Sequence, residues 1–331
     1  MGTMFNRKNI FNGLGILFFL LLPPFAVQFG QEYLLSLFTR ILIYGLAAAS
    51  LDLILGFGGM VSLGHAVFMG VGGYTVGILA FHNYESLPLL SWPFVLNSTE
   101  NALLAWPFAV LVAALFGIVT GAICLRTKGM HFIMITLAFA QMAYYFFVSL
   151  AKYGGSDGLS LYNRSNFPVI NLGSDISFYY LCLAILLLFL IIAHRLVRSH
   201  FGRVISACRE NEQRVQVLGF ASYRYKLACY TFSAAAAGLA GVLLVNQAEF
   251  ISPGLMHWTK SGELMVMVLL GGMGTLTGPV LGAATLLLME DFLAMYTEHW
   301  MIILGPFLIF VVLFAKRGLY GLLTGTGENH D

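Results

Sequence analysis

Long apolar stretches separated by short polar segments run through almost the whole chain. They cover residues 10–30, 34–56, 62–81, 103–124, 130–150, 176–194, 227–246, 262–295 and 300–315. A bilayer-spanning helix needs about 20 mostly apolar residues, which most of these runs supply. The run 262–295 is too long for one span and contains glycines, so we expect two short spans or a re-entrant element there. The pattern predicts an all-α polytopic membrane protein with about nine or ten transmembrane helices in a single domain, residues 1–331.

The composition excludes a soluble protein. Hydrophobic residues make up 59% of the chain, charged residues only 10%, and the mean hydropathy is +0.84. Soluble domains carry about 25% charged residues. The net charge of +2 gives no reason to expect a nucleic acid partner. No metal site is expected, because four cysteines that lie in or beside apolar runs lack metal-ligand spacing: Cys124, Cys182, Cys208 and Cys229.

One segment, residues 194–226, is strongly basic and lies between two apolar runs. It holds seven of the seventeen Lys and Arg residues: Arg195, Arg198, Arg203, Arg209, Arg214, Arg224 and Lys226. Lys and Arg near the ends of spans are retained on the cytoplasmic side of the membrane. We therefore expect this segment to form a cytoplasmic loop.

The other polar segments can be assigned to sides in the same way. Loop 82–102 has no Lys or Arg, which is typical of the periplasmic side, and alternation places loop 151–175 there as well. Basic residues mark the cytoplasmic side at three further places: Arg7 and Lys8, Arg126 and Lys128, and Lys316 and Arg317 of the tail 316–331. Both termini are therefore expected in the cytoplasm.

The basic loop is predicted to hold a short helix at about 204–218. One face of it is apolar at helical spacing, and Gly219 is a plausible C-cap: Val204, Cys208, Val215 and Leu218. Composition alone leaves three interpretations open, which are a solvated connector, a helix lying on anionic lipid, and a protein-docking element. The order RENEQRVQVLG, residues 209–219, resembles the cytoplasmic coupling segment of ABC-importer permeases. That resemblance implies a set of coupling residues: Arg209, Glu210, Asn211, Glu212, Arg214 and Gly219.

Two glycine-rich stretches interrupt apolar runs, at 56–77 and at 271–282. Both contain GGM followed by a hydroxyl residue and Leu, which suggests two related halves, although chance similarity is the alternative. In membranes, glycine lets helices approach closely or lets the backbone break beside a cavity. A lone His in such a run is more often a packed residue than a ligand contact. The candidate substrate-pathway residues are Gly58, Gly59, Ser62, His65, Gly271, Gly272 and Thr275.

Several stretches together, from about residue 40 to 290, resemble the LivM-type permease of branched-chain amino acid ABC importers. They are SLGHAVFMGVGGYT, LRTKGMHFIMITLAFAQ, GGSDGL, FGRVISACRENEQRVQVLGF, YKLACYTFSAAAAGLAGVL and GGMGTLTGPVLGA. The resemblance implies a multi-pass subunit of the bacterial inner membrane, surrounded by membrane lipid. It also implies protein partners: a LivH-like second permease, two cytoplasmic ABC ATPase subunits and a periplasmic substrate-binding protein.

The chain itself is not expected to be an enzyme. It contains no G-x-x-x-x-G-K-[ST] motif, so ATP would be bound and hydrolysed by partner subunits, and no cofactor or catalytic residue is expected. The resemblance implies translocation of leucine, isoleucine and valine. Urea and short-amide importers use permeases of similar pattern and remain an alternative. A second alternative is an ATP-independent secondary carrier, for which the candidate charges lie near proposed span ends: Arg40, Asp52, Glu263, Glu290 and Asp291.

Overall fold

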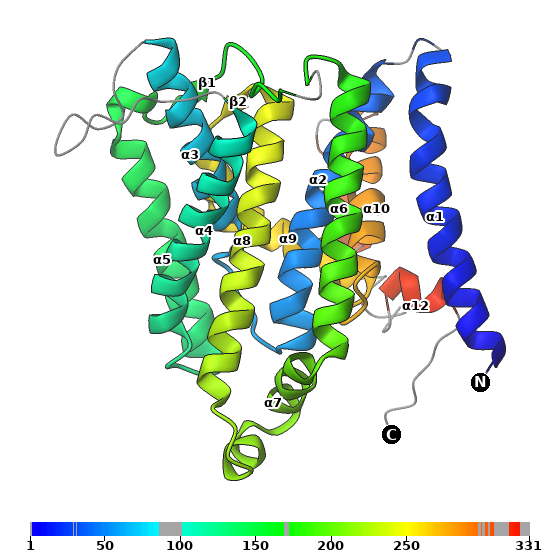
Figure 1. The fold of residues 1–331 in the computed structure, drawn as a ribbon, viewed down its shortest axis with the longest axis vertical. Coiled ribbons are helices and arrows are strands. Elements are labelled where there is room, and N and C mark those ends of the chain that lie inside the picture. The colour runs from blue at the N-terminus through cyan, green and yellow to red at the C-terminus, as the bar shows by residue number, and fades with distance from the viewer. Residues whose placement is uncertain are drawn as a thin grey trace.

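Long helices standing side by side dominate the structure, a computed structural model that describes residues 2–28, 30, 32–85, 101–168, 172–296, 299, 302–303, 305–307 and 318–324 (Figure 1). The helices are α1 (Gly2–Gln28), α2 (Glu32–Asp52), α3 (His65–Tyr84), α4 (Ala102–Cys124), α5 (Met130–Ser149), α6 (Asp175–Arg198), α7 (His200–Val217), α8 (Ser222–Ala248), α9 (Trp258–Gly271), α10 (Gly278–Ala294) and α12 (Gly318–Thr324). Short elements are the π-helical turn η1 (Leu53–Phe57), the 3-10 turns η2 (Ala151–Tyr153) and η3 (Pro253–Met256), and the strands β1 (Leu159–Ser160) and β2 (Phe250–Ile251). The predicted all-α polytopic fold is confirmed.

Six helices in the described part are long and apolar enough to cross a membrane. They are Tyr33–Phe57, His65–Tyr84, Ala102–Cys124, Met130–Ser149, Asp175–Arg198 and Ser222–Ala248. The run 10–30 forms most of α1, whose shorter apolar part is Gly13–Phe25. The run 262–295 divides into two shorter helices, α9 and α10, as expected from its length and glycines. Most of the run 300–315 and most of loop 82–102 lie outside the described residues.

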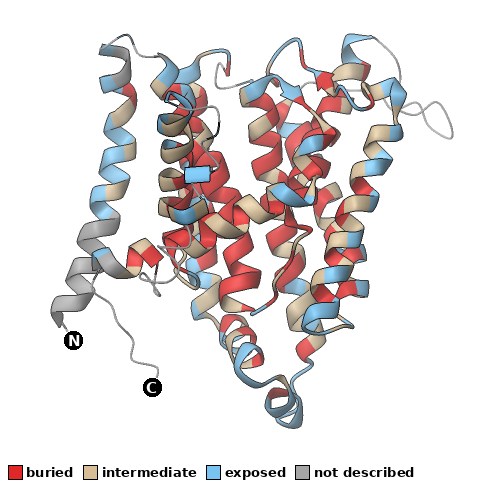
Figure 2. Ribbon diagram, turned by 180° about the vertical axis from the view of Figure 1, so that it is seen from behind, coloured by how far each residue is buried: buried red, intermediate tan, exposed pale blue. Residues whose placement is uncertain are grey.

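The bundle has a buried centre and an apolar outside. In the most apolar windows of α2 and α3, 78% of residues are buried, and in α8 67%, against 33% in α4, 22% in α5 and 39% in α6. Figure 2 shows the buried residues concentrated in the middle of the bundle. The outer helices expose large apolar side chains such as Leu111, Met134 and Ile191. An outside as apolar as the core is what a lipid environment requires.

The central helices α3 and α8 approach each other through glycine. A Cβ atom at Gly72 would lie 2.2 Å from the carbonyl oxygen of Gly238, and one at Gly241 would lie 1.9 Å from the carbonyl oxygen of Met69. Small residues at 233–241, SAAAAGLAG, therefore permit a backbone contact that larger side chains would prevent. The later glycines of the stretch 56–77, which lie in α3, thus serve the packing of α3 against its neighbours.

Replacing Gly241 with valine is expected to destabilise the folded chain by about 1–3 kcal/mol, because the added side chain overpacks the α3–α8 contact. Thermal unfolding in detergent measures the effect. Gly13→Val is the control, since nothing lies within 4 Å of a Cβ atom at Gly13. Equal unfolding temperatures for the two variants would contradict a packing role for Gly241.

The polar segments gather at the two ends of the bundle. Helix α7 lies at one end and the strands β1 and β2 lie at the other (Figure 1). The strands pair antiparallel, with Leu159 opposite Ile251. Figure 1 shows them, and with them loop 151–175, at the end of the bundle away from α7. Helix α1 begins at the α7 end, and α12, the described part of the tail 316–331, lies in the half nearer α7. Which end faces the cytoplasm stays a prediction from the charges.

Candidate transport and coupling site

The first glycine-rich stretch interrupts the helical conformation between α2 and α3. Helix α2 ends at Asp52 and continues as the wider π-helical turn η1, after which residues 58–64 are non-helical. Gly59 adopts φ +65°, a backbone conformation that glycine reaches at no steric cost. Helix α3 then begins at His65. π-Helical turns occur mostly at functional sites, so this interruption is a candidate site on backbone geometry alone.

The second glycine-rich stretch forms the turn between α9 and α10. Gly272 and Gly274 have φ values of +116° and +75°, which explains why glycine is needed at both positions. The hydroxyl of Thr275 donates a hydrogen bond of 2.6 Å to the carbonyl oxygen of Gly272 and so closes the turn. Pro279, in the first turn of α10, suits the start of a helix.

The two interruptions meet inside the bundle at Asp52, Gly56 and Gly274, which we call the glycine junction. Asp52 is 0% exposed, and its Oδ1 accepts a hydrogen bond of 2.8 Å from the Gly274 amide. A Cβ atom at Gly56 would lie 2.1 Å from Asp52 Oδ1 and 2.4 Å from the Gly274 nitrogen. The hydrogen bond between Asp52 and Gly274 can therefore form only because residue 56 has no side chain. Buried acids in membrane helices mark functional sites, and Asp52 lies between two broken spans.

Buried hydroxyl groups hold the first interruption in place. Thr136 of α5 accepts a hydrogen bond of 3.3 Å from the Leu63 amide, and Ser261 of α9 accepts one of 3.0 Å from the Ala66 amide. The second bond satisfies an amide in the first turn of α3, where intrahelical partners are missing. Two helices distant in sequence thus fix the broken segment, and sequence reasoning gave neither residue a place in the site.

The two polar pathway candidates of this stretch, Ser62 and His65, are both 0% exposed. Ser50 donates a hydrogen bond of 2.7 Å to the carbonyl oxygen of Ala47, so Nε2 of His65, 2.9 Å from the same hydroxyl, must be the donor to Ser50. The His65 ring also contacts Phe68 edge to face. The Ser62 hydroxyl accepts a hydrogen bond of 3.3 Å from the Gly64 amide. His65 therefore joins α3 to α2, and Ser62 supports the non-helical segment before α3.

The basic loop forms α7, longer than the predicted helix and divided by a kink at Asn211. Asn211 has non-helical backbone angles, φ −153° and ψ 96°, and its side chain accepts a hydrogen bond of 3.0 Å from the Arg214 amide. Asn211 thus acts as the N-cap of a second short helix. That helix ends at Val217, with Leu218 as its C-cap. Gly219, φ +88°, follows it, and the amides of Gly219 and Phe220 bond to the carbonyl oxygens of Gln216 and Val215, as in a Schellman motif. The predicted glycine thus ends the helix one position after the C-cap.

The end of α7 corrects the predicted apolar face. Cys208 and Val215 are buried and Val204 is half-buried, as expected, but Leu218 is 69% exposed. Leu218 is the C-cap that follows the last residue of α7, Val217, so the helical spacing that assigned it to this face ends before it. Val217 is 87% exposed beside it, and Phe220 is exposed as well. We call the basic loop 194–226 the coupling hairpin, and Val217, Leu218 and Phe220 the hairpin tip. Exposed apolar side chains grouped in this way mark interaction sites.

The charged coupling candidates divide into an inner and an outer set. Glu210 and Arg214 are exposed. Arg209 is also exposed as a whole, but its Nη1 donates a hydrogen bond to the carbonyl oxygen of Gly56. Glu212 forms ion pairs of 2.8 Å with Lys128 and 3.1 Å with Lys226. The structure therefore gives Arg209 and Glu212 partners within the chain, where the sequence led us to expect partners on an ATPase.

Glu212 is ionised in this environment. Burial opposes its ionisation, but hydrogen bonds from Lys128, Lys226 and Ser222 together outweigh burial and hold the pKa of Glu212 below its ordinary value. A carboxyl group with a lowered pKa stabilises the folded state above its unfolded-state pKa, and this stabilisation is lost as the pH falls through the lowered value. The contact is therefore fully formed at neutral pH.

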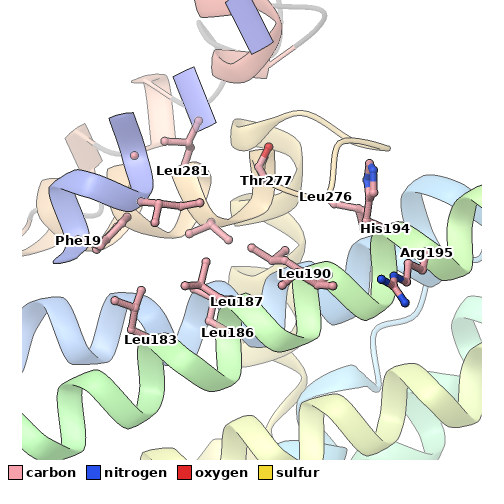
Figure 3. A pocket seen from close by; sticks show the side chains of 14 residues that line it. Phe19, Leu183, Leu186, Leu187, Leu190, His194, Arg195, Leu276, Thr277 and Leu281 are labelled. Carbon is pink, nitrogen blue, oxygen red and sulfur yellow. The ribbon is translucent and has the colours of Figure 1, made fainter. Parts of the chain in front are cut away.

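Two cavities border the glycine segments. One, of about 260 Å³, lies between the first interruption, the α4–α5 turn and α7, and its lining includes Gly58, Gly59, Lys128, Arg209 and Glu212. The other, of about 450 Å³, lies between α1, α6 and α10. Figure 3 shows leucines along that second cavity, with His194 and Arg195 at one end. Its wall is mostly apolar and includes no residue of the first interruption, so the glycine junction is the better candidate for the transport path.

Three acids named for the carrier alternative have local partners. Glu263 pairs with Lys260 at 2.8 Å, and Asp291 accepts a hydrogen bond from the Tyr33 hydroxyl. Asp52 is fully buried in the glycine junction and cannot extend to a membrane surface, contrary to the expectation for a residue at a span end. The contacts of Glu263 and Asp291 lie outside the glycine junction, and the similar proteins described next give the carrier alternative no support.

A bundle of candidate spanning helices, with two glycine-broken segments meeting inside it and a basic hairpin at one end, defines a polytopic membrane permease. A family model described as the branched-chain amino acid transport system / permease component matches residues 33–312. The chain belongs to this family of permeases. No solved structure gives a significant match.

Curated relatives agree with the family. The chain is 28% identical over 320 residues to the high-affinity branched-chain amino acid transport system permease protein LivM of Salmonella typhimurium. The aligned region covers 89% of this chain and 71% of the relative. It is 24% identical over 292 residues to BraD of Pseudomonas aeruginosa, a permease protein of the same kind of system, with 84% and 91% covered. A shorter match, 32% over 127 residues, is to LivH of Escherichia coli, with 37% and 40% covered. These relatives are transport permease components.

Proposed function

We propose that this chain is the transmembrane permease subunit of an importer for branched-chain amino acids, driven by separate ATPase subunits. The family match over residues 33–312 is the observation that carries the proposal. The absence of a phosphate-binding G-x-x-x-x-G-K-[ST] sequence is consistent with ATP hydrolysis on another chain. The protein would lie in the bacterial inner membrane, with α7 and both termini on the cytoplasmic side.

The partners follow from the same comparison. Similarity to both LivM and LivH supports pairing with a second permease subunit of related sequence. Two cytoplasmic ATPases would dock below the bundle, and a periplasmic binding protein would deliver substrate at the opposite end. The hairpin tip suits the ATPase, because three exposed apolar side chains lie beside the exposed charges of Glu210 and Arg214.

Transport would proceed by alternating access around the glycine junction. Closure of the ATPases on ATP would move α7, and the bundle would rock so that the path opens to each side in turn. Gly58 and Gly59 line the cavity above α7, and Gly271, Gly272 and Thr275 form the facing turn. Selection of a branched aliphatic side chain would rest mainly on the binding protein, since apolar area is all that such a side chain requires of the wall.

Uptake measurements test this proposal. In cells that lack their own importers, the chain expressed with its neighbouring transporter genes is expected to take up labelled leucine, and an excess of valine or isoleucine should suppress that uptake. Urea and acetamide should not compete. Competition by urea or acetamide instead would favour the short-amide alternative. Uptake by this chain without any ATPase subunit would favour the secondary carrier.

A further inference from the structure

We propose that Arg209 is a positioning residue that connects the coupling hairpin to the glycine junction, so that movement of α7 reaches the transport path through this one side chain. The inference rests on the proposed function and adds to it the residue that transmits the motion. It also reverses the sequence-based expectation, in which Arg209 would contact the ATPase directly.

The first contact joins Arg209 to the end of a broken helix. Its Nη1 donates to the carbonyl oxygen of Gly56, a residue 153 positions earlier in the chain. Carbonyl groups in the last turn of a helix lack intrahelical partners and carry the negative end of the helix dipole. The amides of Gly59 and Met60 bond to the carbonyl oxygens of Leu55 and Ile54. The guanidinium group thus supplies both a donor and a positive charge to the Gly56 carbonyl.

Close packing reinforces this contact. A Cβ atom at Gly59 would lie 2.9 Å from Cγ of Arg209, so the side chain of Arg209 lies directly against the broken backbone. The positive φ of Gly59 turns the chain at this point. Gly59 therefore makes room for the arginine side chain that extends from α7.

The contact continues to the second glycine turn. Gly56 lies against the Asp52 carboxylate and the Gly274 amide, which bond to each other at 2.8 Å. Displacement of Arg209 would consequently act on α2 and on the α9–α10 turn together, which are the two elements that the proposed path requires to move.

The other inner contact of the hairpin leads elsewhere. Glu212 pairs with Lys128, in the turn between α4 and α5, and with Lys226 at the start of α8. These bonds hold the hairpin to the α4–α5 turn and to the start of α8. Among the side-chain hydrogen bonds and ion pairs of α7 in the described residues, only the hydrogen bond of Arg209 ends at the glycine junction.

The test compares Arg209→Gln with Arg203→Gln, an exposed arginine of the same helix whose side chain contacts His200. In the assembled transporter, Arg209→Gln should lower leucine uptake about tenfold or more, the loss expected for a hydrogen bond to a charged group, while ATP hydrolysis stays within about twofold. Arg209→Lys keeps the charge and should restore part of the uptake. Unchanged uptake, or loss of ATPase subunits from the purified complex, would overturn the inference.

A second measurement does not depend on ATPases. Cys208 is buried next to Arg209, and burial raises the pKa of its thiol, so it should react slowly with a water-soluble maleimide. In membrane vesicles that expose α7, Arg209→Gln should speed labelling of Cys208 by about tenfold, and Arg203→Gln should not. Equal labelling rates would overturn the inference even if uptake is observed. Faster labelling without any uptake by the unmodified protein would uphold the contact and refute the proposed function.

Discussion

Leu218→Asp is expected to abolish ATP-driven uptake and to release the ATPase subunits from the purified complex. Leu218 is 69% exposed at the hairpin tip, between Val217 and Phe220, and has no role in the bundle. If the tip inserts into a groove on the ATPase, a charge placed there is desolvated without a partner. Loss of a central contact of this kind costs about 2 kcal/mol or more, roughly a thirtyfold loss of affinity. Copurification and leucine uptake measure it.

Gln213→Asp is the matched control for the tip. It adds the same charge to an exposed residue of the same hairpin and removes no apolar side chain. We expect this variant to keep most of its uptake. Normal uptake and normal copurification in Leu218→Asp would mean that the tip does not dock, and the solvated-connector or lipid-bound interpretation of the hairpin would then replace the coupling one.

The fold follows from the sequence because one property, the length of each apolar run, specifies each span. The division of 262–295 into α9 and α10 could also be predicted, since glycines and an excessive length occur together there. The start of α3 was harder to predict from the sequence. The apolar run begins at 62, but the helix begins at His65, because hydroxyl groups from other helices hold the preceding residues in a non-helical conformation.

Spacing within α7 was misleading for a physical reason. A helical repeat holds only while the backbone angles hold, and Asn211 interrupts them. Asparagine is favoured at helix N-caps, which is the one sequence signal that could have placed a second helix start at this position. Val215 stays buried beyond the kink, whereas Val217 and Leu218 are the last residue of α7 and its C-cap and are exposed, so the hairpin divides into a tip and an inner face.

The glycine junction shows which part of a site sequence cannot give. Both glycine stretches were identified as path elements, but Asp52 was assigned only to a span end. Its partner, the Gly274 amide, is 222 residues away, and only tertiary packing brings the two together. In the same way, nothing in residues 209–212 indicates that Arg209 points at Gly56 or that Glu212 pairs with Lys128.

Gly56→Ala is expected to have the second large effect, on transport through the junction itself. The new methyl group would lie 2.1 Å from Asp52 Oδ1 and 2.4 Å from the Gly274 nitrogen, so the bond between them must break or the α9–α10 turn must move. Overpacking of this kind costs about 1–3 kcal/mol, roughly a fivefold to 150-fold effect on a conformational equilibrium. Leucine uptake should fall by that factor, while copurification of the ATPase subunits, which depends on the distant hairpin tip, should be unchanged.

Gly262→Ala separates this effect from a general cost of alanine in a membrane helix. Gly262 lies in α9, and nothing is within 4 Å of a Cβ atom there, so its variant should transport normally. Asp52→Asn adds a second comparison, because an asparagine side chain can still accept the Gly274 hydrogen bond but has lost the charge near Arg209. Uptake by Gly56→Ala equal to that of Gly262→Ala would mean that the two broken segments need not stay in contact during transport, and the junction would then be a packing feature outside the path.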